Sequence, residues 1–376
     1  MKSFDTFSNP DGWPSASAAF AGDFRTGERI QAAPWGGYAI LGHAELLSLS
    51  RNPAADGMAA DTNAMAATPV LGRILDRALF TQSGPLHRSE RGAMIAAFAS
   101  LPLQALTDET VHSVMQAAPE RIDLRTDLIE RAVRATWAAL LGLSPENAEG
   151  CEAAVRKMAC LLSQNPCSDM ADVAEVGATD LIEFCKIALY GPSPFVASLQ
   201  SSLGADRAAE LLAGIAFDGI ETIAVGIDAA MRVAFANREA VRPTARCADE
   251  CLRLASPTPL TMRYTTDVIE ISDIVIEPGT PLAMVWAAGN HDPDAFPDPA
   301  QFNAERVSRP LTFGMGHHAC LGHALSRSLL ARLLMEIECL HPEKAPLPER
   351  WRPLAGDWLS PLRVDVKQNA RSRTGR

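Results

Sequence analysis

The stretch from Leu311 to Arg327 contains the residues best suited to binding a metal. Its single cysteine, Cys320, follows a loop that contains Gly314 and Gly316, and it precedes a strongly helical run. Glycines allow tight turns and close backbone approach, and the start of a helix stabilises a thiolate through its dipole and free N–H groups. No second cysteine and no histidine pair with metal-ligand spacing lies beside it. The sequence therefore predicts a metal that already carries most of its ligands, namely a haem iron.

The loop also matches a known pattern. The run Phe313-Gly-Met-Gly-His-His-Ala-Cys320-Leu-Gly322 resembles the haem-binding signature of the cytochrome P450 monooxygenases, and every defined position agrees. The resemblance implies that Cys320 is the thiolate ligand of haem b, that Phe313 packs beside the sulfur and that His318 reaches a haem propionate. A thiolate ligand pushes electron density onto iron and favours O–O cleavage. A buried free cysteine beside a glycine turn would not explain Phe313 or His318.

Further cationic residues fit the propionates of the same haem. The run Pro85-Leu-His87-Arg-Ser-Glu-Arg91 resembles the family's C helix, and Arg263 matches another propionate arginine. His87 and Arg91 lie four residues apart and therefore share a helical face. The planar guanidinium of arginine suits carboxylates. Together with His318, the resemblance therefore assigns four side chains to the two haem propionates.

Glu250 and Arg253 are spaced to lie on one helical face. Alone, this spacing is typical of a solvated ion pair of little energetic weight. The following sequence, with Asn290-His-Asp-Pro293 and Arg306, resembles the family's region from the K helix to the meander. The resemblance implies that Glu250, Arg253 and Arg306 form a buried structural triad, since buried charges are tolerated only when fully paired.

The run Phe217-Asp-Gly-Ile-Glu-Thr222 resembles the family's oxygen-activating helix. The resemblance implies that Glu221 and Thr222 form an acid–alcohol pair that relays protons. The alternative is an acid with a partner elsewhere in the fold and a threonine bonded back to its own helix. Asp218 stands beside Gly219, where an alanine is usual. It would bind a polar substrate group, extend the relay or point away, and the sequence leaves these three open.

Hydrophobic periodicity predicts a mostly helical chain. Helices are expected over residues 44–49, 85–118, 120–163, 171–189, 205–237 and 245–255, and from near Cys320 onward. Short strands are expected around the turn at residues 34–38 and as a pair within residues 268–276. The resemblance implies the cytochrome P450 fold: mainly α with small β-sheets, a single domain over residues 1–376, and disordered tails at 1–15 and 367–376.

Composition excludes several functional classes. The chain has 376 residues, of which 47% are hydrophobic, enough for a large core, and its net charge of −11 argues against nucleic acid. The N-terminus lacks an apolar leader, and the longest apolar run, residues 211–235, contains three acids, which argues against a membrane span. None of the eight cysteines forms a CxxC pair, and all except Cys320 are expected to be reduced small hydrophobes. A cytoplasmic monomer is expected.

The resemblance implies monooxygenation with O2 and two electrons from a ferredoxin and its NAD(P)H-dependent reductase. These partners would dock on the Cys320 side, where five residues are candidates for positive charge: Arg309, His317, His323, Arg327 and Arg332. The expected substrate is an apolar small molecule of secondary metabolism: a terpenoid, a steroid-like or an aromatic compound. Four residues are placed at its pocket: Asp218, Gly219, Leu260 and Trp358. Two alternatives stay open, a peroxide-driven or otherwise atypical P450 oxidation and a non-catalytic haem-thiolate binding or sensor protein.

Overall fold

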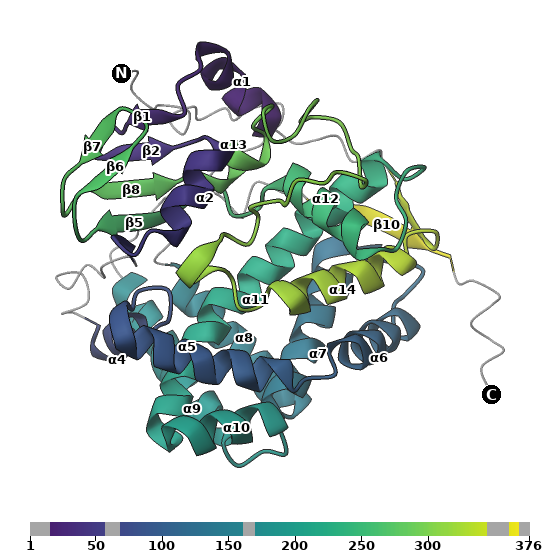
Figure 1. Cartoon of the computed structure of the whole chain (residues 1–376). Helices are drawn as coiled ribbons and strands as arrows, with labels where there is room; N and C mark the ends of the chain where they lie inside the picture. The colour runs from purple at the N-terminus through teal and green to yellow at the C-terminus, as the bar shows by residue number, and fades with distance from the viewer. Residues whose placement is uncertain (1–15, 57–67, 161–169, 344–360, 368–376) are drawn as a thin grey trace.

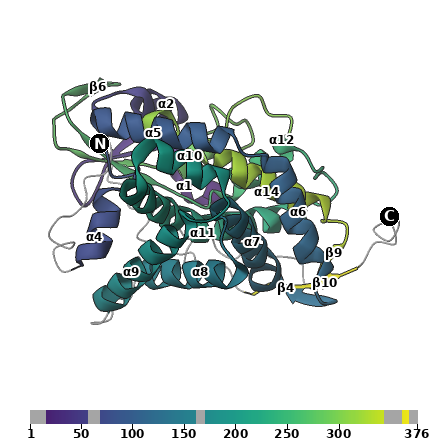
Figure 2. The same ribbon diagram turned by 90° about the horizontal axis from the view of Figure 1, so that it is seen from below.

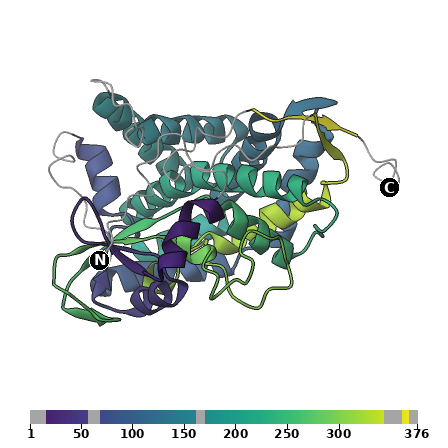
Figure 3. The ribbon, with the colours of Figure 1, turned by 90° about the horizontal axis from the view of Figure 1, so that it is seen from above.

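The computed structural model describes residues 16–56, 68–160, 170–343 and 361–367. These residues form a large helical part and a smaller strand-rich part. The long helix α11 (Ala205–Ala236) crosses the helical part, as views from the front and from above both show (Figures 1 and 3). The prediction of a mainly helical fold with small sheets is confirmed.

The helices account for most of the described chain. Several begin at a serine or threonine whose hydroxyl accepts a backbone N–H, as Ser144, Ser193 and Thr244 do. Beside α11 the helices are α1 (Ala16–Thr26), α2 (His43–Arg51), α4 (Pro69–Asp76), α5 (Gly84–Ala99), α6 (Leu103–Gln116), α7 (Glu130–Leu141), α8 (Pro145–Ala159), α9 (Met170–Ala188), α10 (Pro194–Leu203), α12 (Ala245–Ala255), α13 (Trp286–Asn290) and α14 (His323–Met335), together with the π-helix η2 (Leu124–Ile129) and the 3-10 turn η4 (Gly316–His318).

The described strands form three small sheets: the five-stranded sheet and the β6–β7 pair lie at one side of the molecule, and the three-stranded sheet lies at the other (Figures 1 and 2). A five-stranded sheet has the order β1-β2-β8-β5-β3, a three-stranded sheet has the order β4-β10-β9, and β6 pairs with β7. The strands are β1 (Ile30–Ala32), β2 (Tyr38–Ile40), β3 (Ala55–Asp56), β4 (Arg121–Asp123), β5 (Thr261–Thr265), β6 (Ile269–Ile271), β7 (Ile274–Ile276), β8 (Pro281–Met284), β9 (Leu340–Pro342) and β10 (Arg363–Val366).

Elements with a strong local signal lie close to their predicted positions. The predicted helices at 205–237 and 245–255 are α11 and α12, and the predicted strand pair is β6–β7, in which Ile269 faces Ile276. The run at 85–118 divides into α5 and α6 at Pro102, because proline lacks the N–H that a helix interior needs. The last helix begins at His323, three residues after Cys320, so the cysteine precedes the helix.

One prediction near the three-stranded sheet is wrong. Residues 120–163 do not start as a helix: β4 comes first, and the Asp123 side chain then accepts the N–H groups of Arg125 and Thr126 to begin η2. The cause is that β4, β9 and β10 pair over long sequence separations that no local pattern reports. Of the predicted C-terminal tail, Lys367 donates its backbone N–H to the Cys339 carbonyl at 2.8 Å, and the other residues lie outside the described residues.

The buried guanidinium of Arg253 joins α12 to the loop after α13. It donates to both carboxylate oxygens of Glu250, at 2.7 and 2.8 Å, and to the carbonyls of Asn290 and Pro299 at 2.8 and 2.9 Å. Arg253 is fully buried, with the ring of Phe296 5.0 Å away. A charge with so many partners is a stable core group.

Arg306 completes the predicted triad. Its Nε donates to the same Glu250 carboxylate at 3.2 Å, while its other nitrogens donate to the carbonyls of Pro297, Asp298 and Gln301. The triad therefore fixes the shape of a segment that has no regular secondary structure.

Asn290 links the triad to the cysteine loop through hydrogen bonds. Its Oδ1 accepts the backbone N–H of Leu311 at 2.6 Å, and its Nδ2 donates to the hydroxyls of Ser256 and Thr312. Because the Asn290 carbonyl is itself held by Arg253, the triad and the start of the cysteine loop are one hydrogen-bonded unit.

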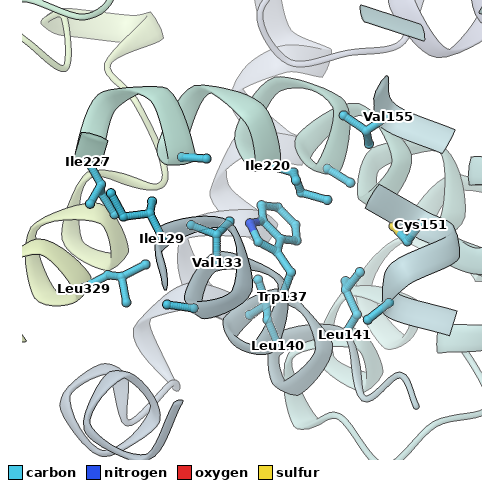
Figure 4. Close-up of a cluster of buried hydrophobic side chains, with 14 of the residues drawn as sticks. Ile129, Val133, Trp137, Leu140, Leu141, Cys151, Val155, Ile220, Ile227 and Leu329 are labelled. Atoms are coloured by element: carbon cyan, nitrogen blue, oxygen red, sulfur yellow. The ribbon is translucent and has the colours of Figure 1, made fainter. Parts of the chain in front are cut away.

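The middle of α11 packs directly on α7, as the core close-up shows for Trp137 beside Ile220 (Figure 4). A Cβ added at Gly219 would lie 2.6 Å from Cζ2 of Trp137, closer than any carbon–carbon contact. Trp137 is 5% exposed and cannot move aside without disturbing its neighbours. Gly219 is thus needed for helix packing on this side of α11.

In the part of the chain that the structure describes, no helix has the length and apolarity to cross a membrane.

We predict that Gly219→Ala destabilises the fold by about 1–3 kcal/mol, the usual cost of overpacking. The matched control is Gly214→Ala in the same helix, where a new Cβ meets Ala78 at an ordinary 3.5 Å. There the higher helix propensity of alanine should give a gain of up to ~1 kcal/mol. Urea unfolding followed by circular dichroism measures both, and equal stability of the two variants would contradict the packing argument.

We also predict that Glu250→Gln lowers the free energy of unfolding by about 3–5 kcal/mol, because it leaves the Arg253 guanidinium buried without a counter-charge. Glu305→Gln is the control, since Glu305 pairs with Arg246 on the surface and such pairs contribute about 1 kcal/mol or less. A loss at Glu250 no larger than at Glu305 would show that the triad does not stabilise this core.

Candidate functional site

Cys320 lies at the end of the cysteine loop, just before α14. Its backbone N–H donates to the Phe313 carbonyl at 2.8 Å, which closes the loop. Burial and the nearby Asp218 carboxylate raise the pKa of the Cys320 thiol to about 11, while the backbone N–H groups of Gly322 and His323 act in the opposite direction. These N–H groups at the start of α14 therefore stabilise the thiolate form.

Glycine is required at one turn of this loop. Gly316 has a φ of 72°, and a Cβ there would lie 1.7 Å from the backbone oxygen of Ser50 at the end of α2. Gly314 has a φ of 62°, with Trp286 at 3.6 Å from its Cβ position. The sequence predicted that the backbone at these glycines closely approaches another group. At Gly316 that group is the backbone of α2.

Asp218 and Thr222 lie one helical turn apart on α11, and both are exposed, as is Cys320. Desolvation raises the pKa of the Asp218 carboxyl to about 6. The Asp218 carboxylate in turn raises the pKa of the Cys320 thiol. The charge of this α11 residue therefore acts on the predicted ligand.

Glu221 occupies a different environment from Asp218. Its carboxylate lies 3.0 Å from Nε of Arg156 and 3.6 Å from Nη2 of Arg125. Arg156 also contacts Glu130 and Glu152 at 2.7 Å each, so that η2, α7, α8 and α11 share one ion-pair network. The carboxylate that raises the Cys320 pKa is accordingly that of Asp218.

Thr222 is bonded back to its own helix. Its hydroxyl donates to the carbonyl of Asp218 and, at 3.3 Å, to that of Gly219. This is the pattern considered for an ordinary helical threonine. The bond also fixes the hydroxyl on the face that Asp218 shares, one turn away.

The predicted propionate residues come together on the Cys320 side of the fold. The rings of His87 and His318 stack with centroids 4.5 Å apart. Burial is the first cause that lowers the pKa of His318 to about 4 and that of Arg263 to about 10, and Arg263 and His87 lower the pKa of His318 further. Arg91 donates to the Ala319 carbonyl next to the cysteine.

This cluster fits the propionates of a haem. Nε2 of His87 and Nδ1 of His318 are buried without a hydrogen-bond partner among the described residues. Arg263 is 8% exposed, and the hydrogen bond described for its side chain goes to the Met262 carbonyl. Two arginines and two histidines, of which His87 and Arg263 are buried, match two carboxylates beside a thiolate ligand.

Sequence reasoning missed Asp56, Arg125 and Arg156. Asp56 lies 3.4 Å from Nε2 of His318, and it opposes the lowering of the His318 and Arg263 pKa values. It comes from the two-residue strand β3, which has no sequence signal. The two arginines come from η2 and α8, and nothing in their spacing links them to Glu221.

Three other residues were predicted at the substrate pocket: Gly219, Leu260 and Trp358. Leu260 is half-buried and packs against a core cluster built on α1, β2 and β8, and Gly219 packs on Trp137. Trp358 lies outside the described residues. A surface hollow of about 400 Å³ borders Gly36, Tyr38 and Glu277 at the edge of the five-stranded sheet, and its lining contains none of the predicted site residues.

Comparisons with known proteins agree with this site. The family model described as cytochrome P450 matches residues 221–338, which include Thr222, the triad and the cysteine loop. A biotin biosynthesis cytochrome P450 of Bacillus subtilis is 37% identical over 113 residues, or 29% of this chain and 28% of that protein. The 6-deoxyerythronolide B hydroxylase of Saccharopolyspora erythraea is 35% identical over 80 residues, or 21% and 20% of the two chains. These alignments span less than a third of the curated relatives.

Solved structures extend the likeness to nearly the whole fold. P450BioI, in complex with an acyl carrier protein ligated to hexadec-9Z-enoic acid, superposes with a TM-score of 0.81 at 20% identity, covering 97% of this chain and 100% of that one. P450epoK bound to epothilone D gives a TM-score of 0.79 at 19% identity, covering 97% and 99%. The cysteine loop and the matched segment at residues 221–338 are thus similar to cytochromes P450, and the fold is that of solved P450 structures.

Proposed function

We propose that this protein is a haem-thiolate monooxygenase in which Cys320 ligates the iron of haem b. The carrying observation is the position of the Cys320 sulfur, which accepts hydrogen bonds from N–H groups at the start of α14 at the end of a closed loop. His87, Arg91, Arg263 and His318 supply the propionate contacts. When bound, the haem supplies the chemistry that activates O2 and inserts one oxygen atom into a C–H bond.

The residues around Cys320 keep its sulfur ionised and in place. Backbone N–H groups of Gly322 and His323 favour the thiolate against the effect of burial. The closed loop between Phe313 and Cys320 fixes the direction of the sulfur. Binding to a metal cation would favour the thiolate further, because the cation offsets the desolvation that raises the thiol pKa.

On α11, Glu221 and Thr222 form the proton route in this proposal. Glu221 is held by Arg156 and Arg125, and its side chain is 23% exposed, so water can reach the carboxylate. The Thr222 hydroxyl is held by its bond to the Asp218 carbonyl and can orient a water molecule on the Cys320 side. A peroxide-driven enzyme or a haem-thiolate sensor would not require this route.

Electrons would come from a ferredoxin and its NAD(P)H-dependent reductase at the Cys320 side of the monomeric protein. Arg309, His317 and His323 are exposed there and suit an acidic partner. Arg327 and Arg332 contribute less than their charge suggests, because Arg327 pairs with Asp249 and Arg332 with Asp108 and Glu336. The described cysteines are all free, which suits the reducing cytoplasm.

The proposed substrate is an apolar small molecule of terpenoid, steroid-like or aromatic type. The middle of α11 supports this class, since Ile215, Phe217 and Ile223 are apolar and only partly buried. The relatives named above differ in what they bind: one solved structure carries a fatty acid on a carrier protein and another carries epothilone D.

The first prediction of this proposal concerns the thiolate. The reduced protein with carbon monoxide should show the long-wavelength absorption band of a thiolate-ligated haem. Cys320→His should replace that band with the shorter-wavelength band of an imidazole-ligated haem. Cys160→Ala, at a half-buried cysteine distant in sequence that forms no disulfide, should keep the wild-type spectrum. A wild-type spectrum from Cys320→His would rule out Cys320 as the ligand.

The second prediction concerns the Thr222 hydroxyl. Thr222→Ala should raise the fraction of consumed NAD(P)H that appears as hydrogen peroxide several-fold, because residue 222 then has no hydroxyl to orient the water molecule of the proton route. Thr222→Ser keeps a hydroxyl at this position and should stay near wild type. Peroxide release can be measured with a surrogate ferredoxin system and without knowing the product. Equal release from all three proteins would eliminate Thr222 from the proton route.

A further inference from the structure

Helix α5 carries a charged residue within its buried stripe. The buried residues of this helix are His87, Glu90, Met94 and Ala97. Glu90 is only 4% exposed, and it lies between His87 and Arg91, the two α5 residues assigned to the haem propionates. A buried carboxylate is costly unless it is fully paired, so Glu90 requires a specific partner.

Arg207, in the first turn of α11, pairs with both oxygens of the Glu90 carboxylate. Its Nε donates to Oε1 at 2.6 Å and its Nη2 donates to Oε2 at 2.5 Å. The side chains of Arg207 and Glu90 are 13% and 5% exposed. Burial acts to raise the pKa of Glu90, but the hydrogen bond and the charge of Arg207 lower it overall, so the carboxylate stays ionised inside the protein.

The same guanidinium joins three helices. Besides Glu90 of α5, it binds the carbonyl of Arg77 at the end of α4 at 2.8 Å and the carboxylate of Glu210 in α11 at 3.1 Å. A cation in the first turn of a helix is unfavourable to the helix dipole, so local helix preference does not explain Arg207. The contact with Glu90 is a planar fork on a carboxylate, which is directional, whereas apolar contacts such as those of Met94 are not.

The rotation of α5 decides where its propionate residues lie. The ring of His87 stacks on that of His318 with centroids 4.5 Å apart, and Arg91 donates to the carbonyl of Ala319. Both residues lie within one helical turn of Glu90. A change in the rotation of α5 about its axis would therefore move both of them relative to the cysteine loop.

Stability alone does not require an ion pair at this place. Replacing a buried ion pair by well-packed apolar side chains is often neutral or stabilising. Met94, about one turn later in the same stripe, is fully buried, so the stripe accommodates a long apolar side chain. What an apolar pair would lack is the directional contact between α5 and α11.

We propose that the Glu90–Arg207 pair sets the rotation of α5 and thereby directs His87 and Arg91 at the haem propionates. Glu90 and Arg207 are positioning residues, because they act through these two side chains. The inference rests on the proposed function, since it assumes a haem beside Cys320.

The test compares the release of haem with the release of haem dimethyl ester from the full-length protein to an excess of apomyoglobin. The ester keeps the ring and the iron but has no propionate charge. Thiolate ligation affects both release rates, so the ratio of ester release to haem release reports on the propionate contacts. The wild type should release the ester at least about 10-fold faster, because hydrogen bonds to charged groups are among the strong ones.

Glu90→Gln should lower this ratio by about 10-fold, because the fork between α5 and α11 is lost. The double variant Glu90→Met with Arg207→Met leaves no unpaired buried charge and should fold stably, yet it should lose the ratio to the same extent.

Two controls should keep the ratio within about threefold of the wild type. Glu210→Gln removes the other carboxylate that contacts Arg207 and leaves the contact with α5 intact. Gly219→Ala disturbs the packing of α11 on Trp137, which is a contact that does not involve α5.

A wild-type ratio in the double variant, or an equal loss of the ratio in either control, would overturn the positioning role. The carbon monoxide spectrum reports separately on the thiolate. A normal thiolate band together with an unchanged ratio in the double variant rejects the positioning role alone, whereas an absent thiolate band in the wild type rejects the proposed function.

Discussion

The order of this site depends on one buried cation, the guanidinium of Arg253. It has no exposed surface, so each of its donors must find an acceptor inside the protein. Glu250 supplies the counter-charge, and backbone carbonyls from the segment after α13 supply the rest. Asn290 extends this hydrogen-bond network to Leu311, where the cysteine loop begins. Hydrogen bonds therefore hold in place a loop that has almost no regular secondary structure. A metal ligand such as Cys320 requires a fixed position of this kind.

Charge on α11 is divided between two sides. Glu221 is neutralised by arginines of η2 and α8, so that side of the helix is tied to the helical part of the fold. Asp218, only three residues earlier, remains uncompensated toward Cys320. Gly219 lies between them and permits the contact with Trp137 that fixes the rotation of the helix. Packing on one side therefore sets the rotation of α11 and with it the directions of both acids.

The sequence predicts the parts of this structure that depend on local spacing. The cysteine loop, α11, α12 and the Glu250–Arg253 pair are recognisable because their signals lie within a few residues. The β4-β10-β9 sheet and the arginine partners of Glu221 were not predictable, since they join segments far apart in the chain. Asp56 was also not predictable, because a single acid in a two-residue strand forms no sequence pattern. The direction of Asp218 required the rotation of α11, which is set by the contact with Trp137.

The back-bonded hydroxyl of Thr222 has one more consequence. Because its hydrogen is committed to the carbonyl of Asp218, the oxygen offers only lone pairs to the space in front of Cys320. The neighbouring Asp218 carboxylate, when ionised, also offers only lone pairs. This stretch of α11 is therefore a surface without donors, and it discriminates by hydrogen-bond polarity. Water molecules bound there would point their hydrogens toward the helix and turn their oxygens toward the bound ligand.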